Sequence, residues 1–290
     1  MGILSGLEAL GLGGASKVNI FEDQKKDENP KEEAVKKEIK EEDCLYDKSY
    51  TCPVCGAAFK QKAVRSGTLK MVSQDKDTRP VYDRFDPSKY DVIFCEKCGY
   101  AALTRFYCAL PKTYKELIKT NISANFKAPA SVKGVMDYDN AILRYKLALL
   151  NSAVRNGKNS EKAYICLKTA WIYRGMEALL NRTDMSENLR ESKRKEYKKN
   201  EFEYLKSAYE GFVKARESET APYAENSSTR TGLNELQLDY LIAVIAWEIG
   251  ENETSYRLFE SVVTSSRASK LQKENAHEFI KDLKIRLKRA

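Results

Sequence analysis

Four cysteines in two identical spacings constrain this chain more than any other feature. They are Cys52 and Cys55 in the run CPVCG, and Cys95 and Cys98 in the run CEKCG. Two intervening residues let both thiolates of a pair turn toward one ion, and the following glycine lets the backbone curl around it. Two such pairs supply the four soft ligands of a closed structural zinc site. The sequence therefore predicts that Cys52, Cys55, Cys95 and Cys98 bind one Zn²⁺.

Iron is the second candidate metal for the same four thiolates. The run CEKCGY at 95–100 resembles a rubredoxin knuckle, and four thiolates suit either ion. A redox-active CxxC pair would not need a second pair. The remaining cysteines, Cys44, Cys108 and Cys166, are scattered, and we expect no fifth ligand because a thiolate site closes at four. Unpaired thiols of this kind are typical of a reducing compartment.

The first 43 residues differ in composition from the rest. The net charge of the 290 residues is +8, yet residues 1–45 contain seven Lys and Arg against eleven Asp and Glu. Residues 22–43 are nearly all charged and cannot bury enough apolar surface to offset their ordering entropy. Residues 1–20 are glycine-rich and apolar. We therefore expect 1–43 to be a disordered tail whose short apolar tip docks on a partner.

Residues 44–111 are expected to form a zinc-ribbon-like metal-binding module. Strands are predicted at 63–65, 69–72 and 91–94, and residues 99–103 are expected to turn into a helix beneath the metal. The 39-residue spacer between the cysteine pairs is polar and rich in turn residues. Its acidic residues lack the glycine and terminal glutamate of an EF-hand, so we expect a solvated loop. They are Asp75, Asp77, Asp83, Asp86 and Asp91.

Residues 112–290 are expected to form an all-α domain of helical hairpins. Residues 236–249 are apolar nearly all round, which predicts an enclosed helix ended by Gly250. Ser160 is a candidate N-cap, and Ser269 with Gln272 resembles a capping box that opens the last helix. Antiparallel helix pairs with short turns are typical of tetratricopeptide (TPR) arrays, and residues 239–263 match that pattern degenerately. The fold class is therefore α+β.

Together these motifs resemble an uncharacterised bacterial family, DUF2225. The resemblance covers roughly residues 44–265. It is carried by LYDK at 45–48, TCPVCG at 51–56, VRSG at 64–67, RP at 79–80, YDVIFC at 90–95, CGYAA at 98–102, AWIYR at 170–174 and DYLI at 239–242. The resemblance implies a cytosolic bacterial protein with an N-terminal metal-binding module and a TPR-like C-terminal region. The family has no established activity.

Enzymatic motifs are not found in the sequence. The single histidine is His277, and there is no nucleophile elbow, phosphate-binding loop or HExxH motif. No apolar run approaches the roughly 20 residues of a membrane span, and residues 1–6 lack the charged region of a secretory signal. These features predict a non-enzymatic, cytoplasmic protein.

Two functions fit this sequence, and a third, a metalloenzyme, would need an open coordination position on the metal. The first is an adaptor, in which zinc fixes the N-terminal module and the helical array binds a protein or peptide partner. The alternative is an RNA- or DNA-associated protein that uses zinc-ribbon loops and basic helices such as 193–199. Glutamates are interleaved with the lysines over residues 191–203, which weakens the alternative. Phosphate contacts would make nucleic-acid binding fall steeply with salt. The oligomeric state stays open.

Overall fold

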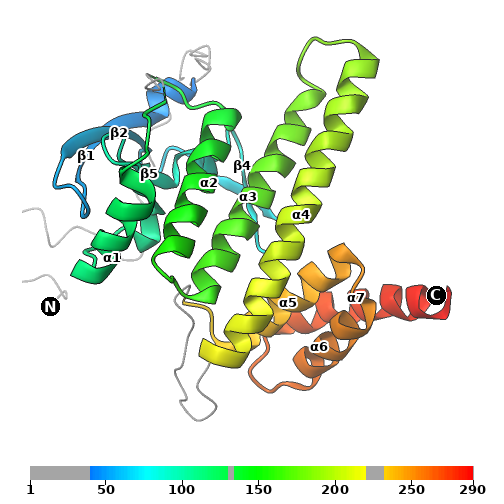
Figure 1. The fold of residues 1–290 in the computed structure, drawn as a ribbon. Coiled ribbons are helices and arrows are strands. Elements are labelled where there is room, and N and C mark those ends of the chain that lie inside the picture. The colour runs from blue at the N-terminus through cyan, green and yellow to red at the C-terminus, as the bar shows by residue number, and fades with distance from the viewer. Residues whose placement is uncertain (1–39, 130–133, 220–231, 290) are drawn as a thin grey trace, which may run out of the picture. The chain divides into compact units, whose positions relative to one another are not determined.

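The computed structural model describes residues 40–129, 134–219 and 232–289, which belong to one compact unit. Small antiparallel sheets come first in the chain and a helical array follows (Figure 1), as the predicted α+β class requires. Most of the expected tail, residues 1–39, lies outside the described residues. Its last residues are structured, because Glu41–Cys44 form a 3₁₀ turn in which Glu41 accepts a hydrogen bond from the Tyr90 hydroxyl at 2.6 Å.

Among the described residues, six strands form three separate two-stranded hairpins. The first hairpin pairs Leu45 with Val64 and Thr51 with Ala58, so its turn is the first cysteine knuckle. The third hairpin pairs Val92 with Leu103, and its turn is the second knuckle. The strands are β1 (Leu45–Thr51), β2 (Ala58–Val64), β3 (Met71–Gln74), β4 (Pro80–Tyr82), β5 (Val92–Phe94) and β6 (Ala101–Leu103).

The predicted strand at 91–94 is confirmed as β5, whereas the helix expected at 99–103 is wrong. Ala101–Leu103 form β6, and all residues of both β5 and β6 are buried. A short apolar run without polar alternation is compatible with either a buried strand or a buried helix, which is why the sequence misled here. The strand expected at 63–65 overlaps the end of β2, and the strand expected at 69–72 overlaps the start of β3.

Seven α-helices follow the cysteine-bearing hairpins in the described chain. Helices α2, α3 and α4 lie side by side (Figure 1). Helix α5 packs against α4, and α6 and α7 follow as a further antiparallel pair that packs on α5. The α-helices are α1 (Lys112–Ile118), α2 (Tyr138–Val154), α3 (Asn159–Leu180), α4 (Glu187–Glu219), α5 (Glu235–Ile249), α6 (Asn252–Thr264) and α7 (Lys270–Arg289).

The helix-end predictions have mixed outcomes. Gly250 ends α5 with φ of 89°, a left-handed conformation that favours glycine. The capping box is confirmed: the Ser269 N–H donates to the Gln272 side chain at 2.9 Å, and the Gln272 N–H donates to the Ser269 hydroxyl at 3.2 Å. Ser160 is not an N-cap, because α3 begins at Asn159. Its hydroxyl instead donates to Glu219 at 2.5 Å, which ties the start of α3 to the end of α4.

One hydrophobic core joins the third hairpin to the helices. Val92, Phe94 and Leu103 are buried together with Tyr145 of α2 and Ile172 of α3. The boundary expected between residues 111 and 112 therefore separates segments that share side-chain packing. Among the described residues, no helix is long and apolar enough to cross a membrane.

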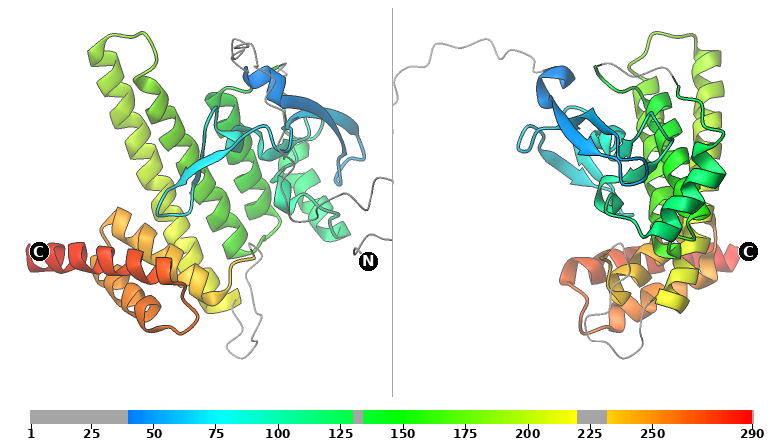
Figure 2. Two further views of the ribbon diagram at one scale, coloured as in Figure 1. Left: turned by 180° about the vertical axis from the view of Figure 1, so that it is seen from behind. Right: turned by 60° about the vertical axis from the view of Figure 1, so that its left-hand side comes forward.

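The β3–β4 hairpin lies across α3 and α4 (Figure 2, left). The expectation that its acidic residues form a solvated loop is wrong for Asp77, whose side chain is 0% exposed. Asp77 accepts hydrogen bonds from Trp171 Nε1 at 2.8 Å and from Arg174 Nη1 at 3.0 Å. The hairpin is thus held to the helices by a buried carboxylate.

Candidate metal centre

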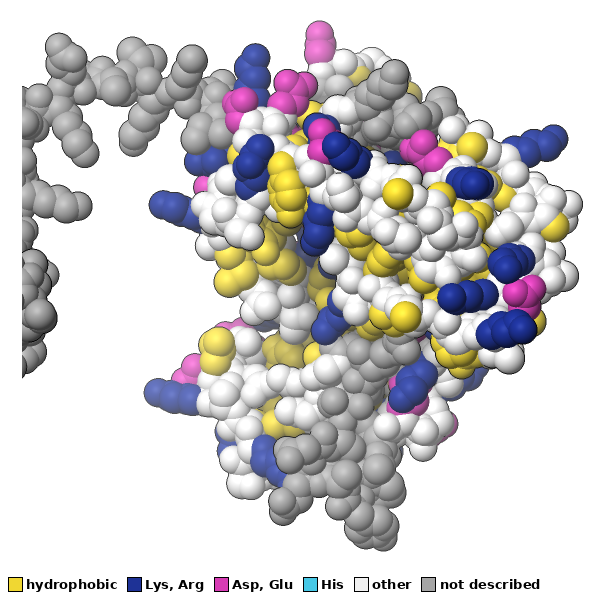
Figure 3. All heavy atoms as spheres, turned by 90° about the vertical axis from the view of Figure 1, so that its left-hand side faces the viewer, with side chains coloured by type: hydrophobic (Ala, Val, Ile, Leu, Met, Phe, Trp, Pro, Cys, Tyr) yellow, Lys and Arg dark blue, Asp and Glu magenta, His cyan; other side chains and the backbone are white. Residues whose placement is uncertain are grey.

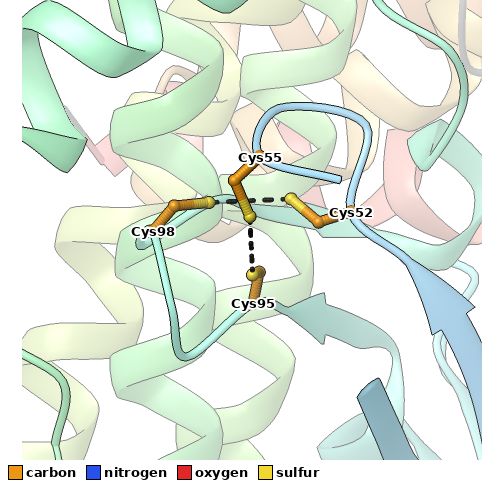
Figure 4. A group of neighbouring side chains, drawn as sticks. All are labelled: Cys52, Cys55, Cys95 and Cys98. Atoms are coloured by element: carbon orange, nitrogen blue, oxygen red, sulfur yellow. Dashed lines mark hydrogen bonds between the residues drawn. The ribbon is translucent and has the colours of Figure 1, made fainter. Parts of the chain in front are cut away.

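The four predicted cysteines converge on one point (Figure 4). Their sulfur atoms all lie within 4.8 Å of one another. The Sγ atoms of Cys52 and Cys98 are 3.6 Å apart, and those of Cys55 and Cys95 are 3.7 Å apart. A tetrahedral ion with metal–sulfur bonds of about 2.3 Å requires sulfur–sulfur edges of about 3.8 Å. The cluster therefore has the dimensions of a tetrathiolate metal site.

The two knuckles have the same backbone structure. In the first, the Gly56 N–H donates to the Cys52 carbonyl at 3.0 Å, and in the second the Gly99 N–H donates to the Cys95 carbonyl at 3.0 Å. The two glycines have φ values of 74° and 75°, so both occupy the left-handed region. The repeated CxxCG run thus folds into two equivalent turns whose thiolates face each other.

The thiols of the cluster can be deprotonated together only next to a cation. Cys52, Cys95 and Cys98 are between 1% and 5% exposed. Hydrogen bonds from Cys52 and Cys98 lower the pKa of Cys95, whereas contacts with Cys52 and Cys95 raise the pKa of Cys98. The thiols therefore cannot all ionise next to one another in the bare protein. A divalent cation would remove this conflict, because thiolate ligands are deprotonated by the ion they bind.

Gln61 connects the two cysteine hairpins. Its side-chain Nε2 donates to the Val92 carbonyl at 2.8 Å, and its Oε1 accepts from the Phe94 N–H at 3.1 Å. Gln61 is only 7% exposed. Strands β2 and β5 do not pair through their backbones, so this side chain supplies the hydrogen bonds between them. It thereby fixes the first knuckle relative to the second.

The second knuckle is also anchored to the helices. Asn151 of α2 is fully buried, and its side-chain nitrogen donates to the Gly99 carbonyl at 2.9 Å. The Ser123 hydroxyl donates to the Cys98 carbonyl at 2.8 Å. Sequence spacing gave no signal for Gln61, Asn151 or Ser123, because each acts through a backbone group distant in the chain.

The other cysteines and the histidine lie elsewhere. The four-cysteine cluster is the single group of potential metal ligands in the described chain, and Cys44, Cys108 and Cys166 are not part of it. Burial raises the pKa of the Cys166 thiol to about 12, which suits an inert side chain in α3. His277 is exposed on α7.

A second polar cluster, the Arg174 network, was not expected from the sequence. Arg174 donates to Glu201 at 2.6 Å, to Asp75 at 3.2 Å and to Glu248 at 3.3 Å, besides its bond to Asp77. Four carboxylates thus surround one guanidinium. Burial and the Asp77 charge raise the pKa of Glu248 to about 8. This network joins the β3–β4 hairpin to α3, α4 and α5.

Comparison with known proteins identifies the family. The model of a family described as an uncharacterized protein conserved in bacteria, DUF2225, matches residues 45–287. A protein of Borreliella burgdorferi, itself named only as an uncharacterized protein, is 23% identical over 147 residues; the match spans 43% of this chain and 51% of that relative. No solved structure matches. Because the family model covers most of the chain, including both cysteine pairs, the protein belongs to the DUF2225 family.

Proposed function

We propose that this protein is a non-enzymatic, cytoplasmic adaptor in which one structural Zn²⁺ organises the cysteine hairpins and the helical array binds a protein or peptide. The closed set of four sulfur atoms carries this proposal. Four protein ligands satisfy tetrahedral zinc and leave no position for a substrate, unlike the three-ligand catalytic sites. Iron remains the second metal, because the same thiolates suit it.

A groove between α4, α5 and α6 is the candidate peptide site. Its volume is about 350 Å³, and it combines apolar side chains with a charged and hydroxylated rim. Apolar surface between antiparallel helices is the usual recognition surface of helical-hairpin arrays. Its lining includes Tyr209, Val213, Ile242, Thr254 and Leu258.

Metal content tests the first half of the proposal. Elemental analysis of the purified full chain is expected to give one zinc per chain, and C95S is expected to lose it because three thiolates leave an open, exchangeable site. Iron in place of zinc would reassign the metal. Full metal retention in C95S would contradict the four-ligand site.

Native mass spectrometry of the tagged protein from its own cells tests the second half. Thr254 lines the groove, whereas Thr264 lies exposed on the same helix outside it. A protein partner is expected with the wild type and T264R and is expected to be lost with T254R. Equal recovery with both variants would place the partner elsewhere.

An RNA- or DNA-associated role is the alternative, and one surface favours it. Lys and Arg side chains outnumber Asp and Glu on the face shown in Figure 3. On β1–β2, Tyr50 stacks against Phe59 with ring centroids 5.8 Å apart, and Lys48 lies 5.5 Å from the Tyr50 ring. Aromatic and basic side chains together are typical of single-strand binding. A complex that dissolves on nuclease treatment would favour this role over the adaptor.

A further inference from the structure

A cavity of about 560 Å³ lies beside the second cysteine knuckle. It is bounded by β2, by the knuckle turn and by α2. Four cationic side chains line it, against two carboxylates. Lys62 is paired with Asp47 at 3.1 Å. The other charged lining residues are Lys60, Lys97, Arg144 and Glu96.

Arg144 is the unusual member of this set. It is 6% exposed, and its Nη1 is buried without a hydrogen-bond partner among the described residues. Its guanidinium lies 5.4 Å from the Phe94 ring centroid, a cation–π contact that does not replace a hydrogen bond to an oxygen acceptor. Burial lowers the pKa of Arg144, and Glu96 opposes that shift only in part. A buried guanidinium with an unpaired donor is costly, and a bound anion would offset that cost.

We propose that this cavity binds a phosphate group, either inorganic phosphate or the monoester of a small molecule, with Arg144 as its principal contact. The planar guanidinium matches phosphate oxygens with two parallel hydrogen bonds. Lys60 and Lys97 are exposed and add positive charge at the entrance. The volume falls within the roughly 300–1,000 Å³ typical of small-molecule sites. The proposal is independent of the adaptor function.

A competing explanation assigns Arg144 to the metal centre. Cys95 also lines this cavity, and a zinc ion with four thiolates carries a formal charge of about −2 that nearby cations could balance. In that case phosphate would not bind, and loss of Arg144 would reduce zinc retention. The two explanations therefore differ in two measurable quantities.

Isothermal titration calorimetry of the zinc-loaded full chain separates them. The titrants are inorganic phosphate and glycerol 3-phosphate at constant ionic strength. The variants are R144Q and the control K270Q, which removes the same charge from a side chain that is 92% exposed on α7. Wild type and K270Q are expected to bind the titrants. The affinity of R144Q is expected to be lower by about tenfold or more, with unchanged zinc content.

Two results would overturn the proposal. One is no saturable binding of either titrant by the wild type, and the other is equal affinity of R144Q and the wild type. Should R144Q fail to fold, the double variant K60Q/K97Q serves instead, because both side chains are exposed. It is expected to weaken binding and to reduce its salt dependence, and unchanged affinity would contradict the proposal. Tighter binding of glycerol 3-phosphate than of inorganic phosphate would indicate that the ligand of the cavity is a phosphate monoester.

Discussion

At the scale of single residues, the two knuckle glycines look alike in sequence but differ in surroundings. A Cβ on Gly56 would meet nothing within 4 Å, whereas a Cβ on Gly99 would lie 2.7 Å from the Phe126 ring and 3.2 Å from Ile122. Both have positive φ. The spacing of the motif thus predicted the turn at both positions but could not predict the close packing at one of them.

Alanine substitution at each glycine measures this difference. We expect G56A to cost about 1–2 kcal/mol, the penalty of a left-handed alanine. G99A is expected to cost roughly 1–3 kcal/mol more, because Phe126 and Ile122 must move. Urea unfolding of the zinc-loaded protein gives both values. Equal destabilisation by G56A and G99A would show that packing at Gly99 has no effect.

Gln61 carries a role that residue type and spacing do not reveal. Q61A would leave the Val92 carbonyl and the Phe94 N–H without their partner in a buried environment. We expect a loss of about 2–3 kcal/mol in unfolding free energy. The control is Q74A. The exposed side-chain amide of Gln74 donates to the Thr78 carbonyl, and its loss should lower the unfolding free energy by no more than about 0.5 kcal/mol. Similar values for both variants in urea unfolding would contradict the bridging role.

At the scale of elements, the sequence located the knuckle hairpins better than the β3–β4 hairpin. Ligand spacing is a local property, so the CxxCG runs specified their turns. The partners of Asp77 are Trp171 and Arg174, which are 94 and 97 residues away in the chain. A polar, turn-rich segment gives no sign of such partners, and it was therefore expected to be solvated.

The Arg174 network makes stability depend on pH. The pKa of Glu248 is about 8 in the folded protein, above its ordinary value of 4.5, so the folded state binds more protons between these values. Stability is therefore highest below pH 4.5 for this group alone and falls as pH rises toward 8. E248Q cannot ionise, and we expect it to be about 1–3 kcal/mol more stable than the wild type at pH 9.

Thermal unfolding of wild type and E248Q at pH 5, 7 and 9 tests this expectation. E253Q is the control, because Glu253 is exposed on α6. The difference between E248Q and the wild type should grow with pH, whereas E253Q should follow the wild type. A constant difference across the three pH values would show that Glu248 has an ordinary pKa in the folded protein.

At the scale of the whole molecule, periodicity predicted which helix faces are apolar but not what covers them. Residues 236–249 were expected to be enclosed, and Leu238–Ala246 are all buried. The packing of β5 and β6 on α2 and α3 could not be predicted from the sequence, because a buried strand and a buried helix have the same hydrophobic pattern. The sequence therefore suggested separate modules where the structure has a shared core.

That shared core changes the expected response to metal loss. If the cysteine hairpins folded alone, C95S would unfold them and leave the helices intact. Because Phe94 and Leu103 pack with Tyr145 and Ile172, we expect chelation or C95S to lower the midpoint of one transition that includes α2 and α3. Differential scanning calorimetry with and without chelator is the measurement. Two resolved transitions, with the helical one unchanged, would show that the modules are independent.

The 39-residue spacing of the knuckles has a consequence during protein synthesis. The first knuckle is synthesised before the second, and α2, which supplies Asn151, is made later still. N-terminal segments generally emerge and begin to fold first. For that interval the nascent chain exposes a pair of reactive thiols that its own fold cannot yet shield. If the site holds the proposed zinc, a shortage of the ion is expected to prolong this stage and to lower the yield of folded protein.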